Sequence, residues 1–230
     1  MSEPRPTRAQ ARVHQIETIK STSRRLMTRH GAAGLSLREV AREMDLVSSA
    51  IYRYFATRDD LLTALIVDAY NDLGAAAERA IGRHRSKDPR HQLQAVASSI
   101  RRWALANPNE YALLYGSPVP GYQAPQMTIE PATRVTQVLS DIITTAWRDQ
   151  PHDADGHSGS TRLTMFERAA LDAAMPGVPD VIRARALMVW TSIFGFISFE
   201  LFGHYVGSVR NATAFFAVVV DECATLVLPQ

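Results

Sequence analysis

Apolar residues recur at helical spacing along most of the chain, and the pattern is clearest between residues 35 and 65. There, Leu37, Val40, Ala41 and Met44 fall at i, i+3, i+4 and i+7, which is one buried face of a helix. The pattern breaks over residues 45–47 and restarts downstream at Ile51 and Phe55. This spacing predicts two short helices joined by a tight turn.

The turn and the ends of this helix pair carry suitable residues. Asp45 tolerates the left-handed conformation that a steep crossing of two helices requires, although less well than Gly. Ser36, with Glu39 three positions later, predicts a capping box for the first helix, and Ser48 or Ser49 is expected to cap the second. The boundaries of both helices are therefore marked by the sequence.

The rest of the chain also has helical rather than alternating periodicity. No segment shows sustained period-two alternation, so we expect an all-α fold. Residues 117–131 are Pro-rich and are expected to form an irregular loop. Further helices are expected at about 13–30, 57–83, 93–107, 108–115, 135–147, 166–174, 180–206 and 211–227.

Charge is distributed unevenly along a chain whose composition is ordinary for a soluble globular protein. The 230 residues are 46% hydrophobic and 21% charged. Residues 1–58 contain 11 Lys and Arg against 5 Asp and Glu, while the remainder contains 14 against 18. Moving the boundary to residue 60 brings in two aspartates and weakens the contrast. The charge asymmetry therefore supports nucleic-acid binding by the N-terminal part but is not decisive evidence for it.

Cysteine content and the N-terminal sequence favour a cytoplasmic protein. Cys223 is the single cysteine, and the first fifteen residues lack the apolar core of a signal peptide. Residues 187–206 are apolar enough to raise a membrane-spanning alternative. Glu200 and His204 argue against it, because a carboxylate inside a span costs roughly 2.5–3.5 kcal/mol. A helix buried in a bundle or subunit interface explains the same composition, and no membrane association is expected.

Catalytic and metal-binding patterns are scarce. The sequence contains no Gly-rich phosphate loop, nucleophile elbow or CxxC pair. His152 and His157 lie in a polar stretch and are interpreted as solvated. Glu200 and His204 share a helical face, and a buried polar couple or a hydrogen bond across a dimer interface is favoured over a metal site. We therefore expect no catalytic residue, no metal and no cofactor.

Aromatic residues gather in the downstream part of the chain. At helical spacing most of them belong to the core. Together with the irregular loop, some can instead line an apolar ligand cavity in which tyrosine hydroxyls supply polar contacts. The candidate ligand-binding residues are Trp103, Tyr111, Tyr115, Tyr122, Phe196, Phe199 and Glu200.

The exposed residues of the second helix of the pair are of the kind that binds DNA. They combine small hydroxyls, aromatic rings and a guanidinium, which meet phosphates and base edges in a major groove. The stretch SLREVAREMDLVSSAIYRYF, running into RDDLLTALIVDAY, resembles the DNA-binding domain of TetR-family transcriptional regulators over about residues 13–60. Downstream, RWALANPNEYALLYGSPVPGY and FGFISFELFGHY resemble the C-terminal domain of the subgroup that bears the WHG domain. Asp45 and Val47 depart from the Gly and the capping Ser usual in the family's turn.

The resemblance implies a division of the chain and a mode of action. It implies a flexible basic arm over residues 1–12, a three-helix helix-turn-helix domain over 13–58, and a larger effector-binding and dimerisation domain over 59–230. Such a homodimer binds a palindromic operator, dimerises through its last two long helices and represses until a small hydrophobic effector releases it, with the long helix after Arg58 as the lever.

Individual residues are carried over by position. Those expected to face or support DNA are Ser36, Arg38, Ser48, Ser49, Ala50, Tyr52, Arg53, Tyr54 and Arg58, with Ser36 and Arg58 at phosphates and Arg5, Arg8 or Arg12 reaching along the groove.

Two other classes of function stay open on the residues alone. One is an α-helical enzyme that uses Glu200, His204 or tyrosines as acid and base groups, although no constellation of nucleophile, base and orienting group is present. The other is a helical adaptor without DNA binding, which the basic N-terminal excess disfavours.

Overall fold

All regular elements in the described part of the chain are helices. The computed structural model describes residues 7–84, 88–148 and 168–229. The helical content confirms the all-α prediction. The chain divides into two compact units, one formed by residues 1–70 with 107–129 and the other by 71–106 with 130–230. The segment 107–129, expected to belong to the C-terminal part, therefore packs with the N-terminal helices.

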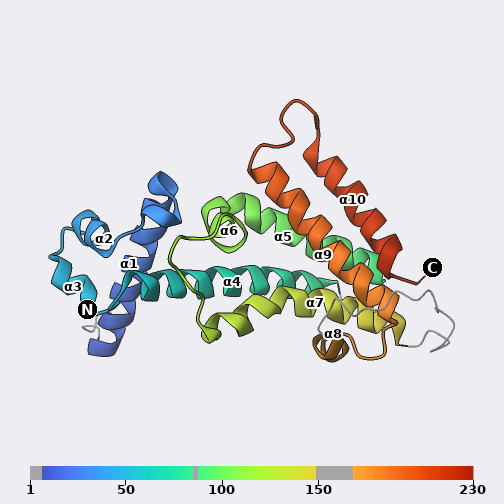
Figure 1. The fold of residues 1–230 in the computed structure, drawn as a ribbon, viewed down its shortest axis with the longest axis horizontal. Coiled ribbons are helices and arrows are strands. Elements are labelled where there is room, and N and C mark those ends of the chain that lie inside the picture. Colours follow the sequence, from blue (N-terminus) through green and yellow to red (C-terminus); the bar gives the residue numbers. More distant parts are fainter. Residues whose placement is uncertain (1–6, 85–87, 149–167, 230) are drawn as a thin grey trace, which may run out of the picture. The chain divides into compact units, whose positions relative to one another are not determined.

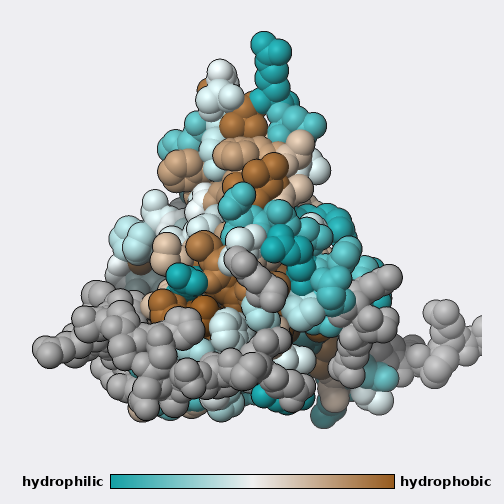
Figure 2. All heavy atoms as spheres, turned by 90° about the vertical axis from the view of Figure 1, so that its right-hand side faces the viewer, coloured by the Kyte–Doolittle hydropathy of each residue, from teal (hydrophilic) through white to brown (hydrophobic). Residues whose placement is uncertain are grey.

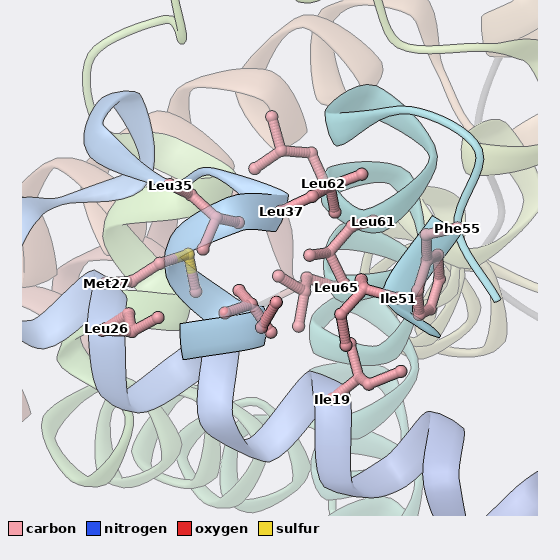
Figure 3. Packing of buried hydrophobic residues seen from close by; sticks show 12 residues of the cluster. Ile19, Leu26, Met27, Leu35, Leu37, Ile51, Phe55, Leu61, Leu62 and Leu65 are labelled. Carbon is pink, nitrogen blue, oxygen red and sulfur yellow. The ribbon is translucent and has the colours of Figure 1, made fainter. Parts of the chain in front are cut away.

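The first unit is built around one hydrophobic core. Its helices are α1 (Arg8–His30), α2 (Leu37–Glu43), α3 (Ser48–Tyr52), the first part of α4 (Arg58–Arg83) and α6 (Pro108–Tyr115), with short 3-10 helices at Ala32–Gly34 (η1) and Gln126–Thr128 (η2). Figure 3 shows side chains from α1, α2, α3 and α4 converging on this core. Its buried members include Ile19, Leu26, Val40, Ile51, Phe55, Leu61 and Leu65.

Helix α1 begins five residues before the expected start at Val13. Thr7 and Gln10 form a complete capping box, in which each side chain accepts a hydrogen bond from the other residue's backbone N–H. This satisfies two amide groups that a helix start otherwise leaves unpaired. Residues 8–12 of the expected arm are therefore helical, and residues 1–6 lie outside the described residues.

The turn between α2 and α3 confirms one local prediction and overturns another. Asp45 adopts a φ of 55°, the left-handed conformation that the sequence indicated. Ser36 caps α2 by accepting from the Glu39 N–H at 3.2 Å, but the Glu39 carboxylate lies near His30 and Arg42 instead of closing the box.

The cap predicted for α3 is wrong. The extended Val47 is the residue before the helix, and its side chain cannot accept a hydrogen bond. Ser48 and Ser49 consequently lie within the first turn. Because the helix begins at Ser48, the capping position falls on Val47, and neither serine occupies it.

The second unit contains longer helices. They are the remainder of α4, α5 (Pro89–Ala106), most of α7 (Ile129–Trp147), α8 (Arg168–Ala174), α9 (Asp180–Leu201) and α10 (Ala212–Val227). Helices α9 and α10 lie side by side in Figure 1 and both pack against α5. Three expected boundaries in this unit shift. Helix α5 starts at Pro89 rather than near residue 93. Helix α7 starts at Ile129, because Pro131 is tolerated in a first helical turn, and α9 ends at Leu201, before the left-handed Gly203 and Gly207.

An arginine ties α7 to α4 within this unit. Arg134 Nε and Nη2 donate to the two oxygens of Glu78 at 2.8 and 2.6 Å, and Arg134 Nη1 donates to the Oδ1 of Asn71 at 2.8 Å. The hydrogen bond from Arg134 lowers the pKa of Glu78. Gly74 makes this approach possible, since a Cβ there would lie 2.7 Å from the Cβ of Arg134.

Helix α9 is long and apolar enough to cross a membrane by length and composition. In the structure, 39% of its most apolar window is buried inside the protein. Helices that form the core of a bundle have the same length and composition.

The left-handed residue in the turn leads to a stability prediction. Asp45→Val should lower the free energy of unfolding by about 1–2 kcal/mol, because a β-branched residue clashes in this conformation. Asp45→Gly and Asp45→Asn should not lower it, since both residues adopt the conformation readily. Urea denaturation of the three variants checks the order, and equal losses in all three would contradict the role of backbone conformation.

Candidate nucleic-acid interface

Helix α3 separates a buried side from an exposed side. Ile51 is fully buried and Phe55, just beyond the helix, is almost so. Ser49, Tyr52 and Arg53 are exposed, whereas the remaining members of the predicted set on this segment, Ser48, Ala50 and Tyr54, are half-buried. Ser49, Tyr52 and Arg53 thus form a short exposed row of hydroxyl, phenol and guanidinium groups, while the opposite side of the helix is held in the core by Ile51 and Phe55.

Tyr54 has a second contact that the sequence did not indicate. Its ring packs against the core cluster of the first unit, and the Arg12 guanidinium lies over the ring with its carbon 5.3 Å from the centroid. A cation over an aromatic face is attracted by the ring quadrupole. The contact places an arginine of α1 beside the end of α3, whereas Arg5, also suggested for the groove, lies outside the described residues.

Four residues of the predicted DNA-binding set surround one hollow in the surface. Ser36, Arg38, Tyr52 and Arg58 line it. The hollow measures about 360 Å³, and Leu37, Ala56 and Thr57 complete its walls. Residues from the start of α2, the end of α3 and the start of α4 therefore meet at one place.

Arg58 is engaged within the protein. Its Nε donates to the carbonyl of Leu35 at 2.8 Å, and its Nη2 lies 3.0 Å from the carbonyls of Ala32 and Ala33. These carbonyls belong to η1 and its end, the connection between α1 and α2. The guanidinium is thus arranged to hold that connection against the start of α4, where Thr57 and Asp60 form reciprocal cap hydrogen bonds.

The cations of the first unit divide into engaged and unengaged groups. Arg24 binds Asp68 at 2.8 Å, and Arg25 lies 3.4 Å from Glu43. Arg38 and Arg53, by contrast, are exposed and have no hydrogen bond or ion pair with any described residue. Unengaged guanidinium groups on the side of α3 can bind phosphates or guanine edges without first losing an internal partner.

Three of the candidate ligand-binding tyrosines belong to the first unit. Tyr111 is fully buried, and its ring lies 5.1 Å from that of Tyr115. The hydroxyls of Tyr122 and Thr63 are 3.0 Å apart, and Tyr122 packs on the core. Burial raises the pKa of Tyr115 and that of its neighbour Tyr70. Tyr122 thus connects the loop after α6 to the core of the first unit, and Tyr115 connects α6 to Tyr70 on α4, with the two ring centroids 6.2 Å apart.

The other four candidates belong to the second unit. Trp103 is half-buried, Phe196 is buried against Phe215 and Phe216, and Phe199 is half exposed. Glu200 accepts hydrogen bonds from Arg101 Nε and Nη2 at 2.7 and 2.6 Å.

Glu200 does not pair with His204, the residue that the sequence placed on the same helical face. Glu200 pairs with Arg101 on α5, while the His204 ring lies 4.9 Å from that of Phe199. Within the described ranges, no group of three His, Cys, Asp or Glu residues can hold a metal ion. His152 and His157 lie outside those ranges.

A cavity in the second unit does not involve any of the seven candidates. It measures about 200 Å³ and lies between α5, α7, α8 and α9. Its walls are largely aliphatic, with Trp190 as the aromatic member. A search for aromatic clusters misses such a site, since its lining residues have the composition of ordinary helix interiors.

The buried and exposed sides of α3, together with the turn at Asp45, define a DNA-binding protein of the helix-turn-helix class. Residues 19–65 match the family model of bacterial regulatory proteins, tetR family, and residues 93–223 match the tetracyclin repressor-like C-terminal domain. The chain belongs to the TetR family of transcriptional regulators. It is a DNA-binding regulator rather than an enzyme, which overturns both alternatives considered from the sequence.

Known relatives agree with this assignment. The chain is 41% identical over 203 residues to the HTH-type transcriptional regulators Rv1816 of Mycobacterium tuberculosis and Mb1846 of Mycobacterium bovis, covering 83% of this chain and 82% of each relative. The crystal structure of the regulatory protein SCO4313 matches with a TM-score of 0.73 and 30% identity over 96% of this chain and 100% of that one. A protein of unknown function from Rhodococcus sp. RHA1 shares the fold, with a TM-score of 0.68 and 23% identity over 93% and 95% of the two chains.

The contrast between Arg58 and Arg38 leads to a second prediction. Arg58→Met should lower the free energy of unfolding by about 1–3 kcal/mol, because three carbonyls lose a charged donor. Arg38→Met, the matched control, should change it by no more than about 0.5 kcal/mol. Denaturant unfolding measures both, and a comparable loss in the two variants would show that the Arg58 hydrogen bonds contribute nothing particular.

Proposed function

We propose that the protein is a cytoplasmic, homodimeric repressor that binds a palindromic operator and is released by a small hydrophobic effector. The observation that carries the DNA-binding part is the exposed row of Ser49, Tyr52 and the unengaged Arg53, together with the unengaged Arg38 on α2. Regulators of this family bind DNA and act as dimers. Repression, the operator symmetry and the effector are our inference for this chain.

The role that we assign to each residue at the operator follows from its exposure and from whether it already binds another part of the protein. Ser49, Tyr52 and Arg53 are free to reach base edges when α3 enters the major groove. Arg38 lies beside the hollow next to α3 and is suited to a phosphate. We assign Arg58 to holding the α1–α2 connection rather than to a phosphate contact, since its donors already bind carbonyls.

An apolar surface on α9 and α10 supports dimerisation. Met188 and Phe199 on α9, and Phe215 and Val218 on α10, expose 40–57% of their surface. Figure 2 shows hydrophobic residues among hydrophilic ones on the upper part of this end, where Figure 1 places these helices and their connection. Exposed apolar residues that continue along two packed helices are typical of a subunit interface. A two-fold axis through this surface would match the symmetry of a palindrome.

The first test concerns the exposed row. Tyr52→Ala and Arg53→Ala should each weaken specific operator binding by about 1–3 kcal/mol, the magnitude of a lost base contact. Genomic fragments selected on the immobilised protein supply the operator, and gel-shift titration of the variants gives the affinities.

The control is another exposed arginine. Arg79 lies on the part of α4 that belongs to the second unit, so Arg79→Ala should leave operator affinity unchanged. Wild-type affinity in both α3 variants would exclude α3 as the reading helix. Variants that weaken binding to all duplexes equally would show that α3 contacts only the phosphate backbone.

The second test concerns the dimer. Val218→Asp should shift the protein toward the monomer, because burying an unpaired carboxylate in a symmetric interface is costly. Val13→Asp is a matched control, since Val13 on α1 is 61% exposed against 57% for Val218. Sedimentation velocity over a concentration series measures both, and an unshifted Val218→Asp dimer would place the interface elsewhere.

A further inference from the structure

We propose that the cavity between α5, α7, α8 and α9 is the effector site and that it accepts an uncharged, largely apolar molecule about the size of one substituted aromatic ring. The proposal rests on the proposed function and specifies the effector. It also moves the site away from the aromatic candidates that the sequence suggested.

The size and lining of the cavity set the class of ligand. Its volume of about 200 Å³ slightly exceeds the roughly 150 Å³ of an apolar cavity known to bind benzene. The walls come from four helices and contain no charged residue among Leu93, Thr136, Leu139, Ser140, Ile143, Leu171, Ala174, Met175, Ala186, Leu187, Val189 and Trp190. A carboxylate or ammonium entering such walls would lose its hydration without gaining a partner.

One polar position remains available in the lining. The Thr136 hydroxyl already donates to the Thr133 carbonyl at 2.7 Å. The half-buried Ser140 hydroxyl has no hydrogen-bond partner among the described residues. One hydroxyl or carbonyl on the ligand, paired with Ser140, would satisfy both groups.

A buried arginine holds the α8 wall in place. Arg183 is 7% exposed and donates from Nε to the carbonyl of Met175 at 3.1 Å. Its Nη1 also binds Asp172 on α8 and Asp180 at the start of α9. These bonds fix α8 and the turn after it on α9, so the cavity is supported by specific contacts on that side.

Helix α9 connects the cavity with the proposed dimer surface. Ala186, Leu187, Val189 and Trp190 line the cavity, whereas the intervening Met188 is 56% exposed on the apolar surface proposed for dimerisation. A ligand that displaces α9 therefore acts directly on a helix of the proposed dimer interface, and so on the relative orientation of the two subunits. This is the coupling that release from an operator requires.

Three probes that differ in one group test the ligand class. Isothermal titration of the full-length protein with propylbenzene, 4-propylphenol and 4-propylbenzoate should show binding of the hydrocarbon and the phenol. The benzoate should bind at least about tenfold more weakly than the phenol, because its charge is left unpaired. Equal binding of the benzoate would overturn the ligand class, and failure of both uncharged probes to bind would overturn the site.

Variants of α8 and α7 test the location. Ala174→Phe fills the cavity and should abolish binding of propylbenzene, whereas Ala173→Phe, on the exposed neighbouring position, should leave it unchanged. Ser140→Ala should weaken 4-propylphenol by about three- to tenfold and leave propylbenzene unaffected. Circular dichroism verifies that each variant is folded, and full binding by a folded Ala174→Phe would place the site elsewhere.

A gel shift in the presence of the probes separates this proposal from the proposed function. Release of the operator by 4-propylphenol, lost in Ala174→Phe but retained in Ala173→Phe, would support both. Binding in the cavity without release would leave a ligand site but overturn its role as the effector site. Loss of operator binding in Ala174→Phe without probe would instead mean that filling the cavity mimics the effector, which supports the coupling.

Discussion

Helix α3 depends on the burial of the side chains on its inner side. A helix of five residues is far too short to be stable in water, and α3 has no side-chain cap at its start. Its conformation is held by Ile51 and Phe55, which enter the core formed with α1, α2 and α4. Full burial of one such side chain contributes about 1.5–3 kcal/mol, more than any single exposed contact of the helix. The exposed residues of α3 therefore contribute little to its stability and are available for contacts with DNA, because the buried residues maintain the helix.

The helix pair was predictable because its local signals agree. The spacing of Leu37, Val40 and Ala41, the left-handed Asp45 and the Ser36 cap all depend on residues a few positions apart. The contacts that the sequence did not reveal join distant residues. Arg58 binds carbonyls more than twenty positions earlier, and Arg12 lies over Tyr54, so neither contact leaves a periodic signal. The packing of residues 107–129 with the first unit was not predicted for the same reason, since it depends on contacts between α6 and α1.

The proposed ligand site was less predictable, because a cavity is a property of packing and not of composition. The aromatic candidates are divided between the two units, and Tyr111 and Phe196 are buried. Glu200, which suggested a polar ligand contact, is neutralised by Arg101. The cavity arises where aliphatic residues of α5, α7, α8 and α9 leave space, and those residues span nearly a hundred positions from Leu93 to Trp190. Nothing in such residues distinguishes a wall from a filled interior until the helices are placed.

Helix α7 offers a physical route from the proposed effector site to the DNA-binding unit. Four residues of α7 line the cavity, and Arg134, two positions before the first of them, binds Glu78 and Asn71 on α4. Gly74 lets the two helices approach closely at this point, because a Cβ there would lie 2.7 Å from the Cβ of Arg134. The same α4 is continuous for 26 residues and contributes Leu61, Leu62 and Leu65 to the core that supports α3. A ligand that moves α7 would therefore act on α4 through the Arg134 hydrogen bonds, which are charge-assisted and bidentate.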